Sequence, residues 1–323
     1  MPSPGPHELL VRIEAVSVNP IDLKMRRAPP ARDGSARILG WDAAGVVQAL
    51  GGQVAGFAVG DEVYYAGSIA RPGCFAQAQT VDHRLVAHKP ASLSYVEAAA
   101  LPLCSLAAWE ALFERLHLVR GRPSETAPQR TLLVLGGAGG VGSMAIQLAG
   151  ALTPWQVVAT ASRPASREHC LALGADAVID HGQPLRAQLK ALGIRGVDAI
   201  LCLTDPSPVF GELADILAPF GQVCSLVEAS ADLPMNLLRG KSASFGWEGM
   251  FTRSLFQTAD MARQGGILAE VAGLVDAGTL RTTMRENGGA LCAASLDAAL
   301  ARLAQGHMIG KLVLAGIDDD TRR

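Results

Sequence analysis

A glycine-rich segment is the part of this sequence best suited to binding a ligand. The apolar run Thr131–Leu135 leads into Gly136–Gly142, where Gly137, Gly139 and Gly142 satisfy the pattern G-x-G-x-x-G. In that pattern the first glycine allows a tight turn, the second lets the backbone approach a pyrophosphate, and the third packs a helix on a strand. The free amides and partial positive charge at the start of the following helix would bind the pyrophosphate.

Glycine-rich turns that bind nothing also show this pattern, so the flanking elements decide between the two interpretations. Here an apolar strand precedes the loop, a helix with apolar Met144 and Ile146 follows it, and a second strand is expected at Gln156–Ala161. These neighbours favour a dinucleotide site. Its predicted cofactor-binding residues are Gly137, Ala138, Gly139, Gly140, Val141 and Gly142.

The choice of dinucleotide depends on the end of that second strand, about 20 residues past the loop. Sites for NAD place Asp or Glu there, to accept a hydrogen bond from the ribose 2′-hydroxyl. This chain instead has Ser162 and Arg163, with Arg167 one helical turn further. Hydroxyl and guanidinium groups suit a 2′-phosphate, so the sequence predicts NADPH. The alternative is that both arginines are merely solvated.

Three further residues are candidates for contact with the cofactor. Leu203 and Thr204 end the apolar run that begins at Val197, and the carboxyl ends of strands in such a sheet face the ligand. Lys311 begins the last apolar run of the chain. We expect its side chain to reach either a cofactor phosphate or only water.

The elements around these residues alternate between strand and helix, which is typical of a parallel sheet covered on both faces. The expected strands are Thr131–Leu135, Gln156–Ala161, Ala177–Ile179, Val197–Leu203 and Gln222–Val227. The expected helices are Val141–Leu152, Ser166–Leu173, Leu185–Leu192 and Val209–Leu217. Before residue 90 the chain shows short strands separated by glycine turns, among them Leu9–Val18 and Ala43–Leu50, which favours a small β-barrel-like domain.

Composition and charge argue against several other classes of protein. Hydrophobic residues make up 49% of the 323 residues, and 28 Lys and Arg stand against 30 Asp and Glu. This balance argues against a nucleic-acid partner. The six cysteines form no C-x-x-C pair and Met1–Pro6 does not resemble a signal peptide, so we expect a cytoplasmic protein. The uncharged stretch Thr131–Ser162 is broken by glycines, which favours strand, loop and helix over a membrane span.

The chain resembles the medium-chain dehydrogenase/reductase superfamily, and within it the zinc-independent quinone oxidoreductase branch and the subgroup labelled zinc-type alcohol dehydrogenase-like. Beside the glycine loop, the matching segments are Val18–Asp22, Gly40–Val47, Val59–Tyr64, Leu106–Leu112, Phe251–Ser254 and Gly306–Leu314. The resemblance implies an α/β protein with a GroES-like catalytic domain interrupted by a Rossmann domain. We expect the GroES-like catalytic domain at residues 1–105 and 281–323, and the Rossmann NADP-binding domain at residues 106–280. The family begins with β-structure ahead of Pro4–Glu8, so we expect either that the true start of the chain lies further upstream or that the first domain is trimmed.

Zinc alcohol dehydrogenases of this superfamily hold a catalytic metal with cysteine, histidine and glutamate side chains. The resemblance matches those positions to Asn19, to Trp41 and Asp42, and to Leu103 with Cys104 as its neighbour. Asparagine, tryptophan and leucine cannot form the mixed sulfur and nitrogen ligand set of zinc. Of the structural zinc lobe only Cys74 is present. We therefore expect a site without metal.

Without a Lewis acid, reduction of a quinone or an α,β-unsaturated carbonyl is a better hypothesis than alcohol oxidation. Asn19 is expected to donate its amide N–H to the substrate carbonyl, or else to fix the turn before Pro20. Tyr64, or its neighbour Tyr65, would line the substrate side, or else pack within the strand. The alternatives for function are a zinc-free alcohol or aldehyde dehydrogenase and a non-catalytic NADPH-binding sensor related to crystallins. Ser242–Trp247 is expected to be an edge strand that pairs with its copy in a homodimer, as relatives do, or else one that is covered by its own chain.

Overall fold

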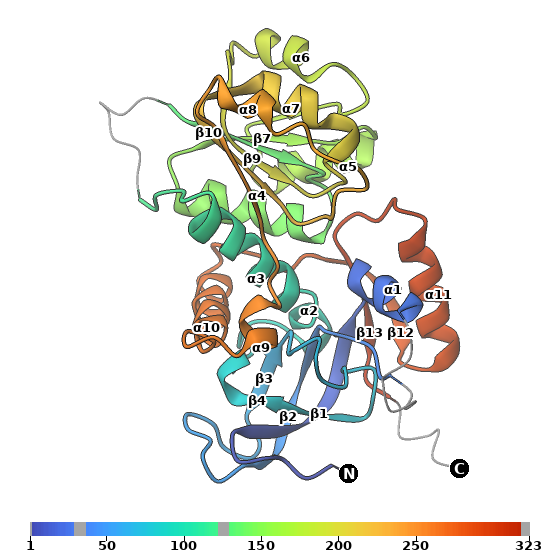
Figure 1. Ribbon diagram of the computed structural model, residues 1–323. Coiled ribbons are helices and arrows are strands. Elements are labelled where there is room, and N and C mark those ends of the chain that lie inside the picture. Colours follow the sequence, from blue (N-terminus) through green and yellow to red (C-terminus); the bar gives the residue numbers. More distant parts are fainter. Residues whose placement is uncertain (1, 29–36, 122–128, 318–323) are drawn as a thin grey trace. The chain divides into compact units, whose positions relative to one another are not determined.

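The computed structural model describes residues 2–28, 37–121 and 129–317, and the chain divides into two compact units (Figure 1). The first comprises residues 1–106 and 250–323, and the second comprises residues 107–249. The chain passes from the first unit to the second within α3 (Pro102–Trp109), which continues as the π-helix η2 (Glu110–Arg115). One stretch, Tyr95–Arg115, is long and apolar enough to cross a membrane, but 83% of its most apolar window is buried, as in a core helix.

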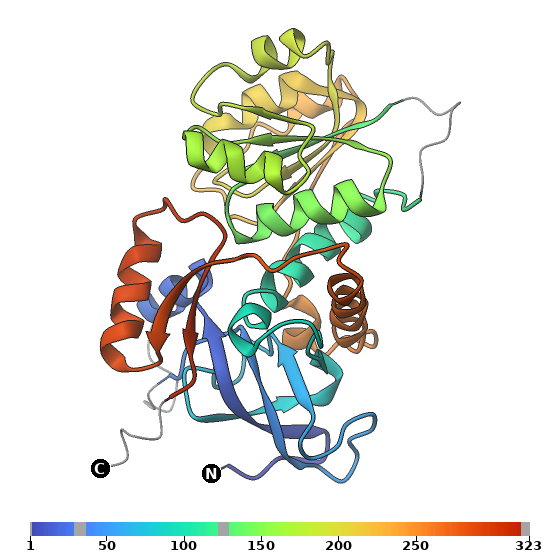
Figure 2. The same ribbon diagram turned by 180° about the vertical axis from the view of Figure 1, so that it is seen from behind.

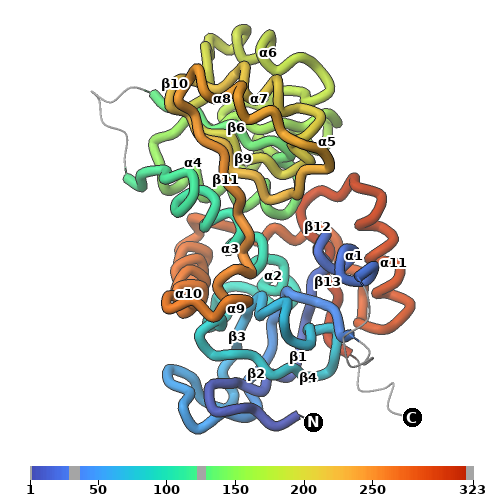
Figure 3. Tube along the Cα trace, in the orientation of Figure 1, coloured from blue at the N-terminus to red at the C-terminus, as the bar shows by residue number. Residues whose placement is uncertain are grey.

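The first unit is built on a seven-stranded sheet in which β1 (Glu8–Ser17) occupies the centre. One edge of β1 pairs with β2 (Ala43–Leu50), while the other pairs first with β4 (Ala78–Asp82) and then with β13 (Lys311–Ala315). The full order is β12-β13-β1-β2-β3-β5, with β3 at Glu62–Tyr65, β5 at Val86–His88 and β12 at Met284–Ala290. The last described strand, β13, thus lies beside the first, β1 (Figure 3).

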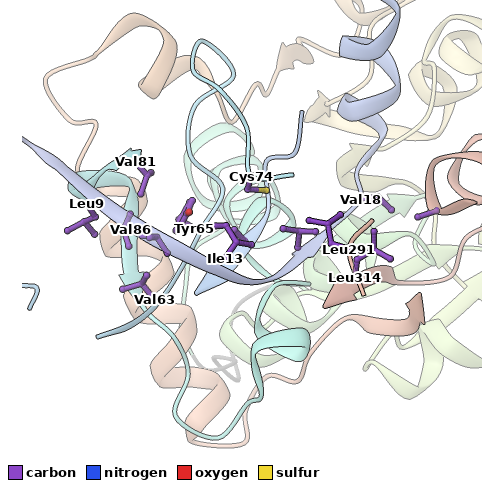
Figure 4. Packing of buried hydrophobic residues seen from close by; sticks show 14 of the residues in the cluster. Leu9, Ile13, Val18, Val63, Tyr65, Cys74, Val81, Val86, Leu291 and Leu314 are labelled. Atoms are coloured by element: carbon purple, nitrogen blue, oxygen red, sulfur yellow. The ribbon is translucent and has the colours of Figure 1, made fainter. Parts of the chain in front are cut away.

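Alternating apolar residues of these strands form the core of the first unit. Leu9, Val11 and Ile13 on β1 are buried in one cluster with Val63 on β3 and Leu314 on β13. Figure 4 labels Leu9, Ile13, Val63 and Leu314 among the residues of this cluster. The helices of this unit are α1 (Pro20–Arg27), η1 (His83–Leu85), α2 (Tyr95–Ala98), α9 (Thr252–Phe256), α10 (Arg263–Asp276) and α11 (Ala293–Ala304). The expected β-rich first domain is confirmed, and it is completed by the C-terminal strand.

The second unit contains a six-stranded sheet whose strands are all parallel, in the order β11-β10-β9-β6-β7-β8. This order is that of a doubly wound dinucleotide-binding sheet, with its reversal point between β6 and β9. The strands are β6 (Thr131–Leu135), β7 (Gln156–Thr160), β8 (Ala177–Ile179), β9 (Val197–Cys202), β10 (Leu217–Ser225) and β11 (Ser244–Trp247). The helices are α4 (Gly140–Leu152), α5 (Pro164–Ala172), α6 (Leu185–Ala191), η3 (Ser207–Val209), α7 (Phe210–Ile216) and α8 (Asn236–Arg239) (Figures 1 and 2).

The predicted boundary at residue 280 differs from the structure, because residues 250–280 lie in the first unit. Helix α10 packs against β5 and η1, and a Cβ added to Gly265 would lie 2.7 Å from the carbonyl oxygen of Arg84. Tyr64 Oη also donates a hydrogen bond to the carbonyl of Leu268 at 2.6 Å. Helical periodicity reveals such a helix, but it does not reveal which sheet the helix covers.

Candidate functional site

The glycine loop between β6 and α4 has the steric features that a bound pyrophosphate requires. A Cβ on Gly142 would lie 2.6 Å from the carbonyl oxygens of both Gly136 and Gly137, so α4 can pack on the loop only with glycine there. A Cβ on Gly139 would meet only the oxygen of Gly136, at 3.9 Å, and otherwise faces open space. The packing role predicted for Gly142 fits the structure, and the pyrophosphate contact predicted at Gly139 stays a prediction.

The tight turn is displaced by one residue from its expected place. Gly136, with φ of +88°, adopts the left-handed conformation, whereas no positive φ is found at Gly137. Gly137 is instead needed for packing, because its Cβ would lie 2.8 Å from that of Ala159. Gly136 N donates to Thr160 Oγ1 at 2.9 Å and Gly137 N to the carbonyl of Thr160 at 3.1 Å. These bonds hold the loop against the end of β7.

The residues predicted to bind a 2′-phosphate follow β7, but they differ in exposure. Ser162 and Arg163 are exposed, and Arg163 is the N-cap of α5. The guanidinium of Arg167 donates to the carbonyls of Ala161 at 3.2 Å and Val178 at 2.7 Å. Arg167 therefore joins α5 to β7 and β8, so the prediction of a phosphate ligand is replaced by a structural role. Ser162 and Arg163 remain the candidates for that phosphate.

Leu203 and Thr204 lie beside the glycine loop, as their position after β9 predicts. The Cβ of Leu203 and the Cγ2 of Thr204 would each be 3.5 Å from a Cβ on Gly136, and Leu203 N donates to the carbonyl of Leu135 at 3.1 Å. Thr204 is exposed. The two residues therefore line the carboxyl end of the sheet next to the loop.

In the first unit, a buried polar cluster gathers around Asp42, whose side chain is fully buried. Its Oδ2 accepts hydrogen bonds from Ser17 Oγ at 2.8 Å and Asn19 Nδ2 at 3.0 Å, and it lies 3.1 Å from Lys311 Nζ. Its Oδ1 accepts from the amide of Leu103 at 2.9 Å. We call Ser17, Asn19, Asp22, Asp42 and Lys311 the Asp42 cluster.

Lys311 reaches neither a cofactor phosphate nor water, so both predictions for it are wrong. Its side chain is 4% exposed, and its ammonium donates to the carbonyl of Val18 at 2.8 Å and to Asn19 Oδ1 as well as facing Asp42. Two hydrogen bonds and an ion pair thus engage the ammonium within the protein. Lys311 is the counter-charge of a buried carboxylate.

Asn19 is 1% exposed and forms the N-cap of α1. Its backbone N–H donates to Asp22 Oδ2 at 2.7 Å, and its Nδ2 faces Asp42 at 3.0 Å and the carbonyl of Ser17 at 3.4 Å. Both side-chain N–H groups thus point toward protein acceptors. The structure favours the expected turn-fixing role, and donation to a substrate would require Asn19 to leave one of these acceptors.

Tyr64 does not line a substrate site, and that prediction is wrong. Its side chain is fully buried, and its hydroxyl is bonded to the backbone of α10. Burial raises the pKa of Tyr64 well above its ordinary value, so the phenol stays protonated. The expected alternative, packing within the strand, describes both Tyr64 and Tyr65, which is 1% exposed.

The positions matched to zinc ligands do come together, but with side chains that do not suit zinc. Asn19 and Leu103 both contact Asp42, while Trp41 is buried and its indole N–H donates to the carbonyl of Ser68 at 3.0 Å. Burial raises the pKa of Cys104 to about 12, which disfavours a thiolate ligand. Across residues 2–28, 37–121 and 129–317, no group of three His, Cys, Asp or Glu side chains could hold a metal ion.

Within the Asp42 cluster, burial raises the pKa of Asp22 to about 7 from the ordinary 3.8. The unfolded chain ionises Asp22 at lower pH than the folded protein does, so this residue contributes less to stability as the pH rises toward and through 7. Asparagine keeps an acceptor for the N–H of Asn19 but does not ionise. The wild type should therefore lose about 2–3 kcal/mol of unfolding free energy, relative to Asp22→Asn, when the pH is raised from about 5 to about 8. Urea unfolding at both pH values measures this; parallel pH dependences of the two proteins would contradict it.

Two elements of the sites were not predicted from the sequence. The partner of Asp42 is Lys311, which no local pattern connects to it because the two residues lie at opposite ends of the chain. The contact between Ser143 on α4 and His169 on α5 joins two helices of the dinucleotide site. An isolated histidine on a helix gives no signal of such a contact.

Comparisons with known proteins agree with this architecture. The family model for the alcohol dehydrogenase GroES-like domain matches residues 5–91, and that for zinc-binding dehydrogenases matches residues 173–314. A zinc-type alcohol dehydrogenase-like protein of Staphylococcus epidermidis is 37% identical over 314 residues, covering 97% of this chain and 92% of its own.

Two solved structures extend the comparison. A protein of Rhizobium etli CFN 42 assigned to the zinc-dependent alcohol dehydrogenases has a TM-score of 0.93 and 44% identity, covering 98% of this chain and 92% of its own. A quinone oxidoreductase of Pseudomonas syringae pv. Tomato DC3000 has a TM-score of 0.80 and 26% identity, covering 98% and 93%. With its GroES-like and Rossmann folds, this chain belongs to the medium-chain dehydrogenase/reductase superfamily of oxidoreductases that bind a nicotinamide dinucleotide.

Proposed function

We propose that this protein reduces quinones or α,β-unsaturated carbonyl compounds with NADPH and without a catalytic metal. The observation that carries the proposal is the Asp42 cluster. The side chains at the positions matched to zinc ligands are engaged in hydrogen bonds or apolar packing, and the positive charge near Asp42 is the ammonium of Lys311. The similarity to a quinone oxidoreductase supports the same reaction class.

NADPH, when bound, would supply a hydride from its nicotinamide ring. The residues of this chain bind and orient it: the amides at the start of α4 face the pyrophosphate, and Ser162 and Arg163 hold the 2′-phosphate. Leu203 and Thr204 limit the space beside the loop. A carbonyl acceptor that takes a hydride also needs one proton. We expect solvent to supply this proton. Such a reduction requires orientation and exclusion of water rather than a Lewis acid.

A panel of quinones, enones, aldehydes and alcohols tests the proposal directly. We expect NADPH consumption with at least one quinone or enone and slower NADPH consumption with aldehydes. Alcohols are assayed with NADP⁺, which accepts their hydride, and we expect its reduction to be slower as well. Exclusive turnover of alcohols and aldehydes would instead identify a zinc-free dehydrogenase. Tight NADPH binding without any turnover would identify the non-catalytic sensor.

The preference for NADPH is tested by Arg163→Gln. Because a guanidinium bonds strongly to a phosphate, we expect the Kd of NADPH to rise about 10- to 100-fold. The Kd of NADH should change less than about twofold, since NADH lacks the 2′-phosphate. Arg195→Gln, at an exposed arginine of the same unit, is the matched control. Equal or tighter binding of NADH by the wild type would refute the preference.

We also propose that the protein is a cytoplasmic homodimer joined through β11. In the described part of the second sheet, β11 lies at the edge and pairs only with β10. Trp247 on β11 is 50% exposed and Phe220 on the neighbouring strand is 79% exposed. Large apolar side chains beside an unpaired strand edge are suited to pairing with a second copy. A monomeric mass in light scattering would exclude the dimer.

A further inference from the structure

Helix α5 contacts the dinucleotide loop and the start of α4 through two consecutive side chains. His169 Nε2 lies 2.8 Å from Ser143 Oγ, and the two residues are 8% and 0% exposed. The next residue, Cys170, is fully buried, and its sulfur would be 3.2 Å from a Cβ on Gly137. The helix that follows the 2′-phosphate residues is therefore in direct contact with the pyrophosphate loop.

Ser143 faces two carbonyl groups of that loop. Its Oγ lies 3.4 Å from the carbonyl oxygen of Ala138, and its backbone N–H donates to the carbonyl of Gly139 at 2.8 Å. In a planar trans peptide, the N–H of the next residue points opposite to the carbonyl. Because the carbonyls of Ala138 and Gly139 point toward Ser143, the N–H groups of Gly139 and Gly140 point away from Ser143. A Cβ on Gly139 would also face open space, so this part of the loop is accessible to a ligand.

We propose that His169 is a positioning residue for the dinucleotide pyrophosphate. Its Nε2–H donates to Ser143 Oγ, and the Ser143 hydroxyl donates in turn to the carbonyl of Ala138. This chain of hydrogen bonds holds the first peptide planes of α4 so that the amides of Gly139 and Gly140 stay directed at the phosphates. The inference rests on dinucleotide binding at the loop, and not on the substrate or on the preference for NADPH.

The pyrophosphate is common to NADPH and NADH, so loss of the chain should weaken both cofactors by the same factor. This separates His169 from Arg163, whose loss should weaken NADPH alone. The net value of one buried hydrogen bond corresponds to a change of about tenfold in Kd.

The test is equilibrium binding of NADPH and of NADH, measured by titration calorimetry without substrate. For His169→Leu and Ser143→Ala we expect both Kd values to rise about tenfold. His169→Gln restores an N–H donor and should return both values to within about twofold of the wild type. Thr153→Val is the matched control, because it removes a hydroxyl that donates to Ala149 at 2.7 Å at the other end of α4. It should lower the melting temperature while leaving both Kd values unchanged.

Three results would overturn the proposal. They are unchanged Kd values in folded Ser143→Ala, a Kd increase for NADPH alone, and an equal Kd increase in Thr153→Val. If His169→Leu does not fold, the Kd values of Ser143→Ala alone test the proposal. This variant removes only one hydroxyl, so we expect it to fold. Failure to find a quinone or enone substrate would refute the proposed function but would leave these binding results interpretable.

Discussion

Gly139→Val is expected to leave the fold intact while raising the Kd of both dinucleotides at least about 100-fold. Gly139 has φ of −72° and ψ of 176°, a conformation open to any residue, and its Cβ position is open. The folded protein therefore tolerates a side chain there. A bound pyrophosphate does not, because the valine would occupy the space through which the phosphate approaches the backbone.

Gly142→Ala provides the contrast. A Cβ there meets two carbonyl oxygens at 2.6 Å, so the loop must shift and both stability and affinity should fall. Calorimetric Kd values and melting temperatures of the two variants measure the difference. Wild-type affinity in Gly139→Val would mean that the phosphates lie elsewhere.

The second large effect is expected for Lys311→Met. It leaves the buried carboxylate of Asp42 without its counter-charge and removes the donors to Val18 and Asn19. Breaking a buried ion pair from one side costs about 3–5 kcal/mol of unfolding free energy. Adding Asp42→Asn removes the uncompensated charge, so the double variant should recover most of that loss.

Urea unfolding of the single and double variants tests this account, with Lys190→Met, at an exposed lysine, as the control. A loss below about 1 kcal/mol in Lys311→Met would show that the pair contributes little to stability. A double variant no more stable than Lys311→Met would show that the charge of Asp42 is not the cause of the loss.

Much of the second unit could be predicted because its signals are local. The expected ranges of β6 and β8 match the structure residue for residue, and α4 and α6 differ by one residue at one end. Apolar runs bounded by glycine and polar turns carry this information. The glycine pattern also identified the loop, although it assigned the tight turn to Gly137, whereas the residue with positive φ is Gly136.

The predictions that were wrong concern side chains whose partners lie far away in the sequence or depend on the tertiary fold. Lys311 and Arg167 are expected from their charge to bind phosphate or to be solvated, but both donate to acceptors within the protein. Tyr64 is expected to line the substrate side or to pack within its strand, and the structure shows that its hydroxyl donates a hydrogen bond to the carbonyl of Leu268, 204 residues later. Residue type predicts what a side chain can bind, whereas tertiary packing determines which partner lies within hydrogen-bond distance.

Hydride transfer without a metal is the central claim, and the turnover rate of metal-stripped enzyme tests it most directly. NADPH consumption with the best quinone or enone is measured before and after dialysis against a strong chelator, with the zinc content determined for both samples. We predict zinc far below one atom per chain and the same rate in both samples. Stoichiometric zinc, with activity lost on removal and regained on its return, would contradict the account.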